Sequence, residues 1–313
     1  MGITRDEALD CLRSDDLLGI GMEADAVRRR LHPEGIVTYG IGAPLDLGSV
    51  QGGAKKIESL VDQLLLCIEA GATGIRIRGL SQSAGAHAVR ESLDTVRTLR
   101  NNFPSVWLEV ASLEIQAISN LSRLQPATLV SELQDAGIDA IGVDEDSAAT
   151  TSKSSNNSLQ MHRAAHQAGM PTVATLTFGV ETSIEQRVEQ LVRLHELQTE
   201  TGGFMALAVV ATLAAGGREL DGVTAVERLK MLATARMFLD SILHVTAMPS
   251  AHGLKVLQTS LRFGANDLGW VPPVAGKSDS PHEAPEEDMR RIIRDAGFTP
   301  AERDARYRAM IAV

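Results

Sequence analysis

From residue 36 onward, short runs of apolar and β-branched residues alternate with longer amphipathic segments. This alternation is typical of βα units, in which helices join parallel strands. It recurs about eight times, which predicts an α/β fold and, within that class, a (β/α)8 barrel of the TIM type. The expected strands are Ile36–Ile41, Gly74–Arg78, Val106–Ala111, Ala140–Val143, Thr172–Phe178, Met205–Ala211, His244–Ala247 and Leu268–Val271.

The amphipathic segments predict the helices that cover this barrel. They are Lys55–Glu69, Ala86–Asn101, Ala127–Ala136, Leu159–Ala168, Ile184–Gln198, Ala225–Leu239, Gly253–Phe263 and Glu286–Ala296. Left-handed helix caps are expected at Gly71, Gly137, Gly169, Gly202, Gly264 and Gly297. We expect one domain, with a helical lead-in over residues 1–35, the barrel over 36–285, and a C-terminal helix and tail over 286–313.

A doubly wound sheet is the competing fold, and it requires a glycine-rich phosphate loop after its first strand. Gly19-x-Gly21 follows a poor strand, and Gly40-x-Gly42 is followed by Pro44 and a long loop. Turn geometry explains both pairs better than nucleotide binding does. The barrel remains the favoured fold.

Composition narrows the function. The chain has 313 residues, a formal net charge of −10 and 3% aromatic residues, which argues against nucleic-acid binding. Arg28–Arg30 and Arg290–Arg294 have acidic neighbours, so we expect solvated helix faces there. No signal peptide and no membrane-spanning apolar run are evident, and two cysteines do not form a disulfide framework. We expect a cytoplasmic protein with a small-molecule ligand and no membrane partner.

Six segments of the chain form a recognisable set. They are residues 22–39 (MEADAVRRRLHPEGIVTY), Ala174–Thr182 (ATLTFGVET), Arg193–Phe204 (RLHELQTETGGF), Ala235–Asp240 (ARMFLD), Leu261–Gly269 (LRFGANDLG) and Arg290–Arg303 (RRIIRDAGFTPAER). These segments resemble the radical S-adenosylmethionine (SAM) enzymes of menaquinone biosynthesis, in particular the dehypoxanthine futalosine cyclase branch, and they appear in the family's order from about Leu17 to Tyr307. The resemblance implies the barrel fold most directly.

The resemblance also implies a Cys-x3-Cys-x2-Cys motif after the first strand, and this chain lacks it. Gly40 to Lys56 contains no cysteine, and the whole chain has only Cys11 and Cys67. Three thiolates are needed to hold a [4Fe–4S] cluster that leaves one iron for SAM. We therefore expect no cofactor: no [4Fe–4S] cluster, no metal site, and a barrel mouth that is disfavoured for SAM.

Other departures from the family pattern fall near the same end of the barrel. Arg78–Gln82 replaces a Gly-Gly-Leu-Asn-Pro segment, and Val143–Ser147 replaces Gly-Gly-Gly-Ala-Glu. Gly179–Glu181 lacks the family's histidine, and Trp270–Pro273 replaces a Glu-Glu-Asn segment. In a barrel, the loops that follow strands line the active-site face, so these changes predict an altered site.

Carboxylates after the fourth and fifth strands are the candidate catalytic groups, namely Asp144, Glu145 and Glu181. Adjacent carboxylates can exchange protons or bind a hard cation, but a solvent-exposed acidic turn is the simpler explanation of the first two. The candidate ligand-binding residues are Tyr39, Arg78, Glu109, Thr175, Thr177, His252, Asn266 and Asp267.

Three of these assignments have structural alternatives. Glu109 could instead form an ion pair with Arg76 or Arg78, and Asn266 and Asp267 could shape a loop through an Asx turn. His162 and His166 have helical spacing but lack the glutamate of a His-Glu-x-x-His motif, so no zinc site is expected.

Two functions compete on these grounds. The first is a cluster-less homologue, a pseudoenzyme that binds a small nucleoside-like or polar ligand at the barrel mouth and serves beside an active paralogue. The second is a lyase or hydrolase that uses the carboxylates of the mouth. A homodimer and a complex with a paralogue both remain open.

Overall fold

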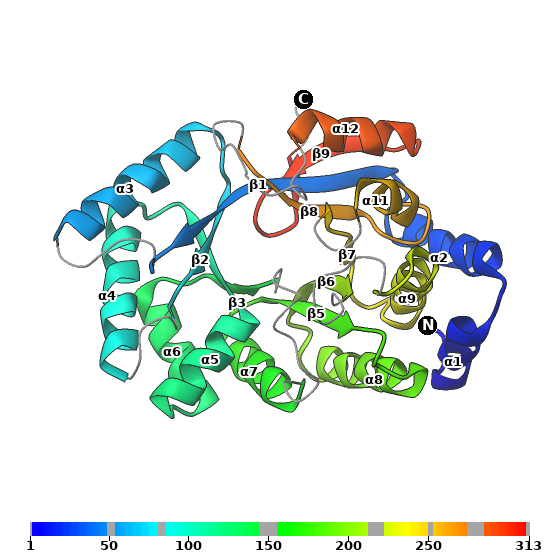
Figure 1. Cartoon of the computed structure of the whole chain (residues 1–313), viewed down its shortest axis with the longest axis horizontal. Coiled ribbons are helices and arrows are strands. Elements are labelled where there is room, and N and C mark those ends of the chain that lie inside the picture. Colours follow the sequence, from blue (N-terminus) through cyan, green and yellow to red (C-terminus); the bar gives the residue numbers. More distant parts are fainter. Residues whose placement is uncertain are drawn as a thin grey trace.

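The computed structural model describes residues 2–48, 54–80, 86–143, 155–211, 222–249, 253–273 and 285–310, and within them eight parallel strands form a closed ring (Figure 1). Each strand pairs with the next, and β8 closes on β1, so the predicted (β/α)8 barrel is confirmed. The strands are β1 (Ile36–Asp46), β2 (Gly74–Arg78), β3 (Trp107–Ala111), β4 (Ala140–Gly142), β5 (Thr172–Phe178), β6 (Phe204–Ala211), β7 (His244–Thr246) and β8 (Asp267–Val271).

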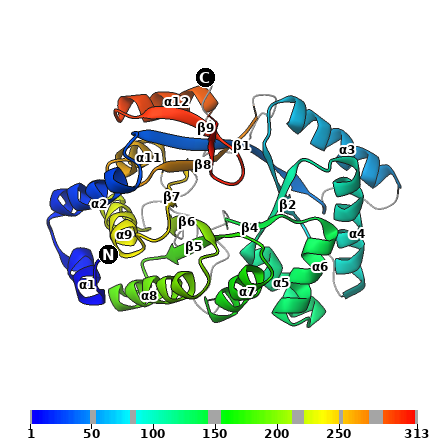
Figure 2. The ribbon, with the colours of Figure 1, turned by 180° about the vertical axis from the view of Figure 1, so that it is seen from behind.

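Helices surround the ring on its outer side (Figure 2). They are α1 (Arg5–Arg13), α2 (Leu17–Leu31), α3 (Ala54–Glu69), α4 (Ala86–Asn102), α5 (Ser112–Ser122), α6 (Pro126–Ala136), α7 (Ser155–Gln167), α8 (Ile184–Thr201), α9 (Ala225–Phe238), α11 (Leu254–Ser260) and α12 (Glu286–Asp295). Capping boxes begin α1, α8 and α9, where a hydroxyl and a carboxylate or amide satisfy the first backbone N–H groups. All six glycines expected as left-handed caps have positive φ.

The C-terminal tail was expected to continue from a helix, but it returns to the barrel as β9 (Thr299–Arg303) and β10 (Ala309–Met310). Thr38 of β1 pairs with β8 on one edge and with β9 on the other. The later residues of β1, from Gly42 onward, pair with β2. Strand β9 therefore pairs with the N-terminal part of β1, on the same edge that pairs with β2 further along.

Strand alternation divides the apolar residues into outer and inner layers. Two outer clusters lie between the strands and the helices, one over β1 and β5–β8 and the other over β1–β4. A small inner cluster faces the lumen and includes Val173, Ala208, Met248 and Tyr307. Tyr307 comes from the β9–β10 turn and has φ of 63°, so the tail inserts a side chain into the barrel from its N-terminal end.

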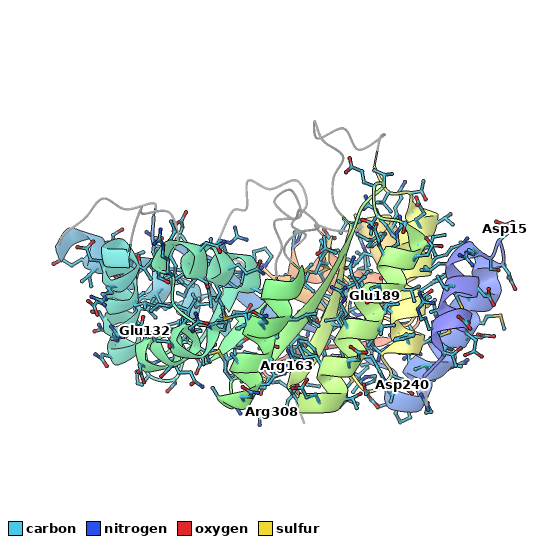
Figure 3. All side chains as sticks on the ribbon, turned by 90° about the horizontal axis from the view of Figure 1, so that it is seen from below. Asp15, Glu132, Arg163, Glu189, Asp240 and Arg308 are labelled. Atoms are coloured by element: carbon cyan, nitrogen blue, oxygen red, sulfur yellow. The ribbon has the colours of Figure 1, made fainter. Side chains whose placement is uncertain are left out.

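Figure 3 shows labelled charged side chains, among them Arg163, Asp240 and Arg308, on the outside of the molecule. The arginine cluster on α2 is only partly solvated, contrary to our expectation. Arg28 is buried, donates to Asp25 Oδ1 over 2.8 Å, and lies 4.4 Å from the Phe298 ring centroid. Over the described ranges, none of the helices has the length and apolar character needed to cross a membrane.

Candidate functional site

The N-terminal end of the lumen, here called the barrel base, is built around the Asp267 carboxylate. Its Oδ2 atom accepts hydrogen bonds from Thr38 Oγ1 over 2.7 Å and from Arg303 Nε over 2.5 Å. Its Oδ1 atom accepts from Thr246 Oγ1 over 3.0 Å and from the Gly269 amide over 2.9 Å. Asp267 and Arg303 are both 0% exposed. The carboxylate thus connects β8 to β1, β7 and β9.

The Asn266 side chain is also held by hydrogen bonds within the barrel base. Its Oδ1 atom accepts from Arg236 Nη2 over 2.7 Å and from the Val245 amide over 2.9 Å, and its Nδ2 lies 3.1 Å from His244 Nδ1. Burial lowers the pKa of Arg236 to about 9, and that guanidinium also donates to the Gly264 carbonyl.

The structure therefore corrects two predicted ligand contacts. Asn266 and Asp267 lie at the start of β8 in the barrel base, and buried hydrogen bonds within the chain occupy their oxygens. They position strands, as the alternative of a structural role had allowed.

Above the base, Trp270 extends across the lumen. Gly269 has φ of 74° and forms a bulge, because one residue of β1, Tyr39, there faces two of β8, Leu268 and Gly269. The bulge directs Trp270 inward, where its ring packs against three glycines. A Cβ atom added to Gly40, Gly42 or Gly74 would lie 2.5 to 2.6 Å from the indole.

Two charged residues hold this indole in place. The Arg303 guanidinium lies 4.6 Å from the Trp270 ring centroid, and the indole N–H donates to Glu109 Oε1 over 3.0 Å. Burial raises the pKa of the Glu109 carboxyl, and the positive charge of Arg76 partly offsets that rise. Gly142 leaves room for the carboxyl, since an added Cβ would lie 2.6 Å from it. Glu109 therefore lies beside the positive charge of Arg76, as the ion-pair alternative expected.

Beyond Trp270, inward-facing residues near the C-terminal ends of the strands keep part of their surface exposed. We call this region the barrel mouth; it includes Pro44, Arg78, Ala111, Thr175 and Thr177. The two threonines of β5 alternate with residues of the outer core, so both face the lumen as expected. Arg78, at the end of β2, pairs in register with Asp46 of β1. These three predicted ligand contacts therefore share one end of the barrel.

Glu181 follows β5 in an exposed turn. Asp144, Glu145 and His252, the other candidates expected near this end, lie outside the described residues. The alternative of a lyase or hydrolase that uses mouth carboxylates therefore stays a prediction.

Tyr39 does not join the mouth. Its side chain points outward from β1 into the outer core, where its hydroxyl donates to Glu286 Oε1 of α12 over 2.8 Å. Burial raises the pKa of Tyr39. The prediction failed because β1 is buried on both faces, so apolar alternation alone could not show which residues face inward.

The helical histidine pair, His162 and His166, is largely buried and contacts Thr172. His162 Nδ1 and His166 Nε2 lie 3.0 and 2.7 Å from the Thr172 hydroxyl. Burial lowers the pKa of His162 to about 3 and that of His166 to about 4, so both are neutral near pH 7.

The residues that could hold iron are few. Cys11 lies on α1 and Cys67 on α3; both pack against the outer apolar clusters, and burial raises the pKa of each thiol. Across the ranges the structure describes, no three His, Cys, Asp or Glu side chains form a metal-binding group.

Known proteins share both the sequence and the fold of this chain. An aminodeoxyfutalosine synthase of Thermus thermophilus is 34% identical over 251 residues, covering 72% of this chain and 67% of its own. The chain belongs to the futalosine-pathway branch of the radical SAM family. Residues 211–312 match the family model described as the CofH/MqnC C-terminal region.

A second member of this branch extends the match over the full length. A cyclic dehypoxanthine futalosine synthase of Streptomyces coelicolor is 26% identical and covers 99% of this chain and 86% of its own. Among solved structures, methylornithine synthase superposes with a TM-score of 0.65 at 13% identity, covering 96% of this chain and 95% of its own. That likeness supports the barrel fold alone.

The residues of this chain do not fit the cluster that gives the radical SAM family its chemistry. A [4Fe–4S] cluster open to SAM needs three thiolates on one loop, and the segment between β1 and α3 supplies none. Cys11 and Cys67 lie on two different outer helices. No reaction step can be assigned to a cluster here.

Proposed function

We propose that this chain is a cluster-less member of the futalosine-pathway branch, which binds a small nucleoside-like ligand at the barrel mouth without radical chemistry. The observation that carries the proposal is the cysteine-free segment from Gly40 to Lys56, together with a total of two cysteines in the chain. Without three thiolates there is no site-differentiated cluster, and without a cluster SAM is not cleaved reductively.

The filling of the lumen supports the same proposal. Where the family pattern has Glu-Glu-Asn, this chain has Trp270, whose indole contacts Gly40 and Gly42 of β1, the strand that leads into the cluster loop. A bulky aromatic ring thus stands in a segment where the family pattern is polar. This substitution fits a barrel that has kept its scaffold and changed its ligand.

The ligand class follows from the relatives and from the mouth. The relatives are named for aminodeoxyfutalosine and cyclic dehypoxanthine futalosine synthesis. The mouth presents Arg78, Thr175 and Thr177, which are suited to hydroxyl and carboxylate groups. We therefore assign a nucleoside-like or other small polar ligand, in a role accessory to an active paralogue.

Anaerobic reconstitution tests the central claim. The purified chain is incubated with ferrous iron, sulfide and reductant, desalted, and assayed for bound iron, sulfide and sulfide-to-iron charge-transfer absorbance. The Thermus thermophilus relative is treated in parallel as the positive control. We expect no stoichiometric iron in this chain, and a four-iron cluster in it would refute the proposal.

A further inference from the structure

Trp270 has no role in the function proposed above, and its surroundings suggest one. The indole lies between the barrel base, where Arg303 and Asp267 are fully buried, and the mouth, where Thr175 and Thr177 are partly exposed. Its side chain is itself only partly buried, although it crosses the middle of the lumen.

Most sides of the indole are already covered. Atoms of its six-membered ring are those nearest to the Cβ positions of Gly40, Gly42 and Gly74, so this ring packs against the backbone of β1 and β2. The N–H group, on the same side of the indole as Cζ2, donates to Glu109 of β3.

One face of the ring is covered as well. Arg303, which belongs to the buried base, lies 4.6 Å from the ring centroid, the usual distance for a guanidinium stacked on an aromatic face. Because Arg303 belongs to the base, the other face of the indole is turned away from the base, and Trp270 keeps part of its surface exposed. A partly exposed indole is suited to stack with a flat ring.

We propose that Trp270 is a ligand-binding residue whose mouth-side face stacks on a planar aromatic ring of the ligand. The inward-facing Thr175 and Thr177 then contact polar groups at the edge of that ring. This inference deepens the proposed function, on which it rests, by naming a planar aromatic group as the part of the ligand that enters the barrel.

Fluorescence can test this without altering Trp270. The chain has two tryptophans, Trp107 and Trp270. Trp107 lies beside Arg306 of the β9–β10 turn, so a Trp107→Phe variant keeps an aromatic ring there and leaves Trp270 as the single emitter. This variant is titrated with inosine, with 4-hydroxybenzoate, and with ribose as the non-aromatic control, each with and without acrylamide as a collisional quencher.

We expect at least one aromatic probe to change the Trp270 emission saturably and to protect it from acrylamide, whereas ribose does neither. By calorimetry, Trp270→Phe should bind that probe within about threefold of the parent, and Trp270→Leu should bind it about tenfold or more weakly, with folding checked by circular dichroism.

Two results would overturn the assignment: no saturable effect of either aromatic probe, or equal binding by the parent and Trp270→Leu. Ribose binding as tight as inosine binding would also reject stacking, while leaving a polar ligand site intact. The iron assay above is independent of all these outcomes, so the failure of one proposal is distinguishable from the failure of the other.

Discussion

At the barrel base, the Asp267 carboxylate accepts hydrogen bonds from β1, β7 and β9 and is fully buried, whereas at the mouth Arg78 and Thr177 keep part of their surface exposed. The two regions belong to the same strands and differ by a few residues in height. Polar side chains at the base hold strands together, and the proposed ligand site lies at the other end of the barrel.

The segments that resemble the family and the segments that depart from it also lie at opposite ends of the barrel. The segments ARMFLD and LRFGANDLG supply Arg236, Asn266 and Asp267, which contact one another or their neighbours in the base. The altered segments follow the strands at the other end. The family-like segments of this chain therefore build the barrel, whereas the residues that would determine its chemistry lie among the altered segments at the mouth.

The largest expected loss of stability follows from a substitution in the barrel base. Replacing Arg303 with leucine leaves the Asp267 carboxylate buried without its cation, and should lower the free energy of unfolding by about 3–5 kcal/mol. Urea denaturation followed by circular dichroism measures the loss.

Two controls make this result specific to the base. Arg308→Leu removes an ion pair with Asp304 whose arginine side chain is 76% exposed, and should cost less than about 1 kcal/mol. Thr177→Val, in the mouth, should change stability by no more than about 0.5 kcal/mol. If all three variants lost equal stability, the distinction between base and mouth would be wrong.

A second, smaller effect concerns the boundary between the two regions. In Gly74→Ala the new methyl group would lie 2.5 Å from the Trp270 ring, so overpacking should cost about 1–3 kcal/mol. In a Trp270→Leu background the same change should cost clearly less, because the ring that it meets is gone. A double-mutant cycle of urea midpoints measures this coupling, and a coupling of zero would contradict the contact.

The smallest expected effect is a pH dependence that originates in the base. Burial lowers the pKa of His244 to about 4, with Asp267 opposing and His32 reinforcing the shift. The unfolded chain, with a pKa of about 6.5, takes up the proton first as the pH falls. The contribution of His244 to stability is therefore present well above pH 6.5 and is lost as the pH falls toward 4, by about 1 kcal/mol between pH 7 and 5.5. The buried His162 and His166 add losses of the same sign.

His244→Asn provides the test of that prediction, since an asparagine oxygen can still accept the hydrogen bond from Asn266 Nδ2 and does not titrate. Unfolding free energies of parent and variant are compared across this pH range. The variant should show a shallower slope, and parallel curves would exclude His244 as the source.

Much of the fold could be predicted from the sequence. β2 and β5 have the predicted bounds, and the left-handed caps lie where glycine follows an amphipathic segment. Such features depend on local periodicity and on the conformational freedom of single residues, both of which are visible in a short window.

The missed features depend on contacts between distant parts of the chain. β1 was expected to end at Ile41 because GIGAPLD looks like a loop, yet its glycines make room for Trp270, more than 200 residues later. β9 contains Pro300 and charged residues and is a poor strand by composition, but β1 offers it a free edge.

The site was predicted less well for the same reason. When a strand is buried on both faces, one sequence does not show which alternate residues face the lumen. Tyr39 was therefore assigned to the lumen, although its side chain points outward. Trp270 was noted as a departure from the family pattern but not as a site residue, because the Gly269 bulge that directs it inward has no sequence signal beyond a single glycine.

The position of β9 has a consequence for how the protein is made. Because β9 pairs with β1 and carries Arg303 into the base, synthesis must proceed past residue 303 before the N-terminal part of β1 can pair with β9. Until then, Asp267 has no cation and the lower edge of β1 has no partner. Nascent chains that end before about residue 298 should therefore depend on chaperones, because β9 completes the barrel base.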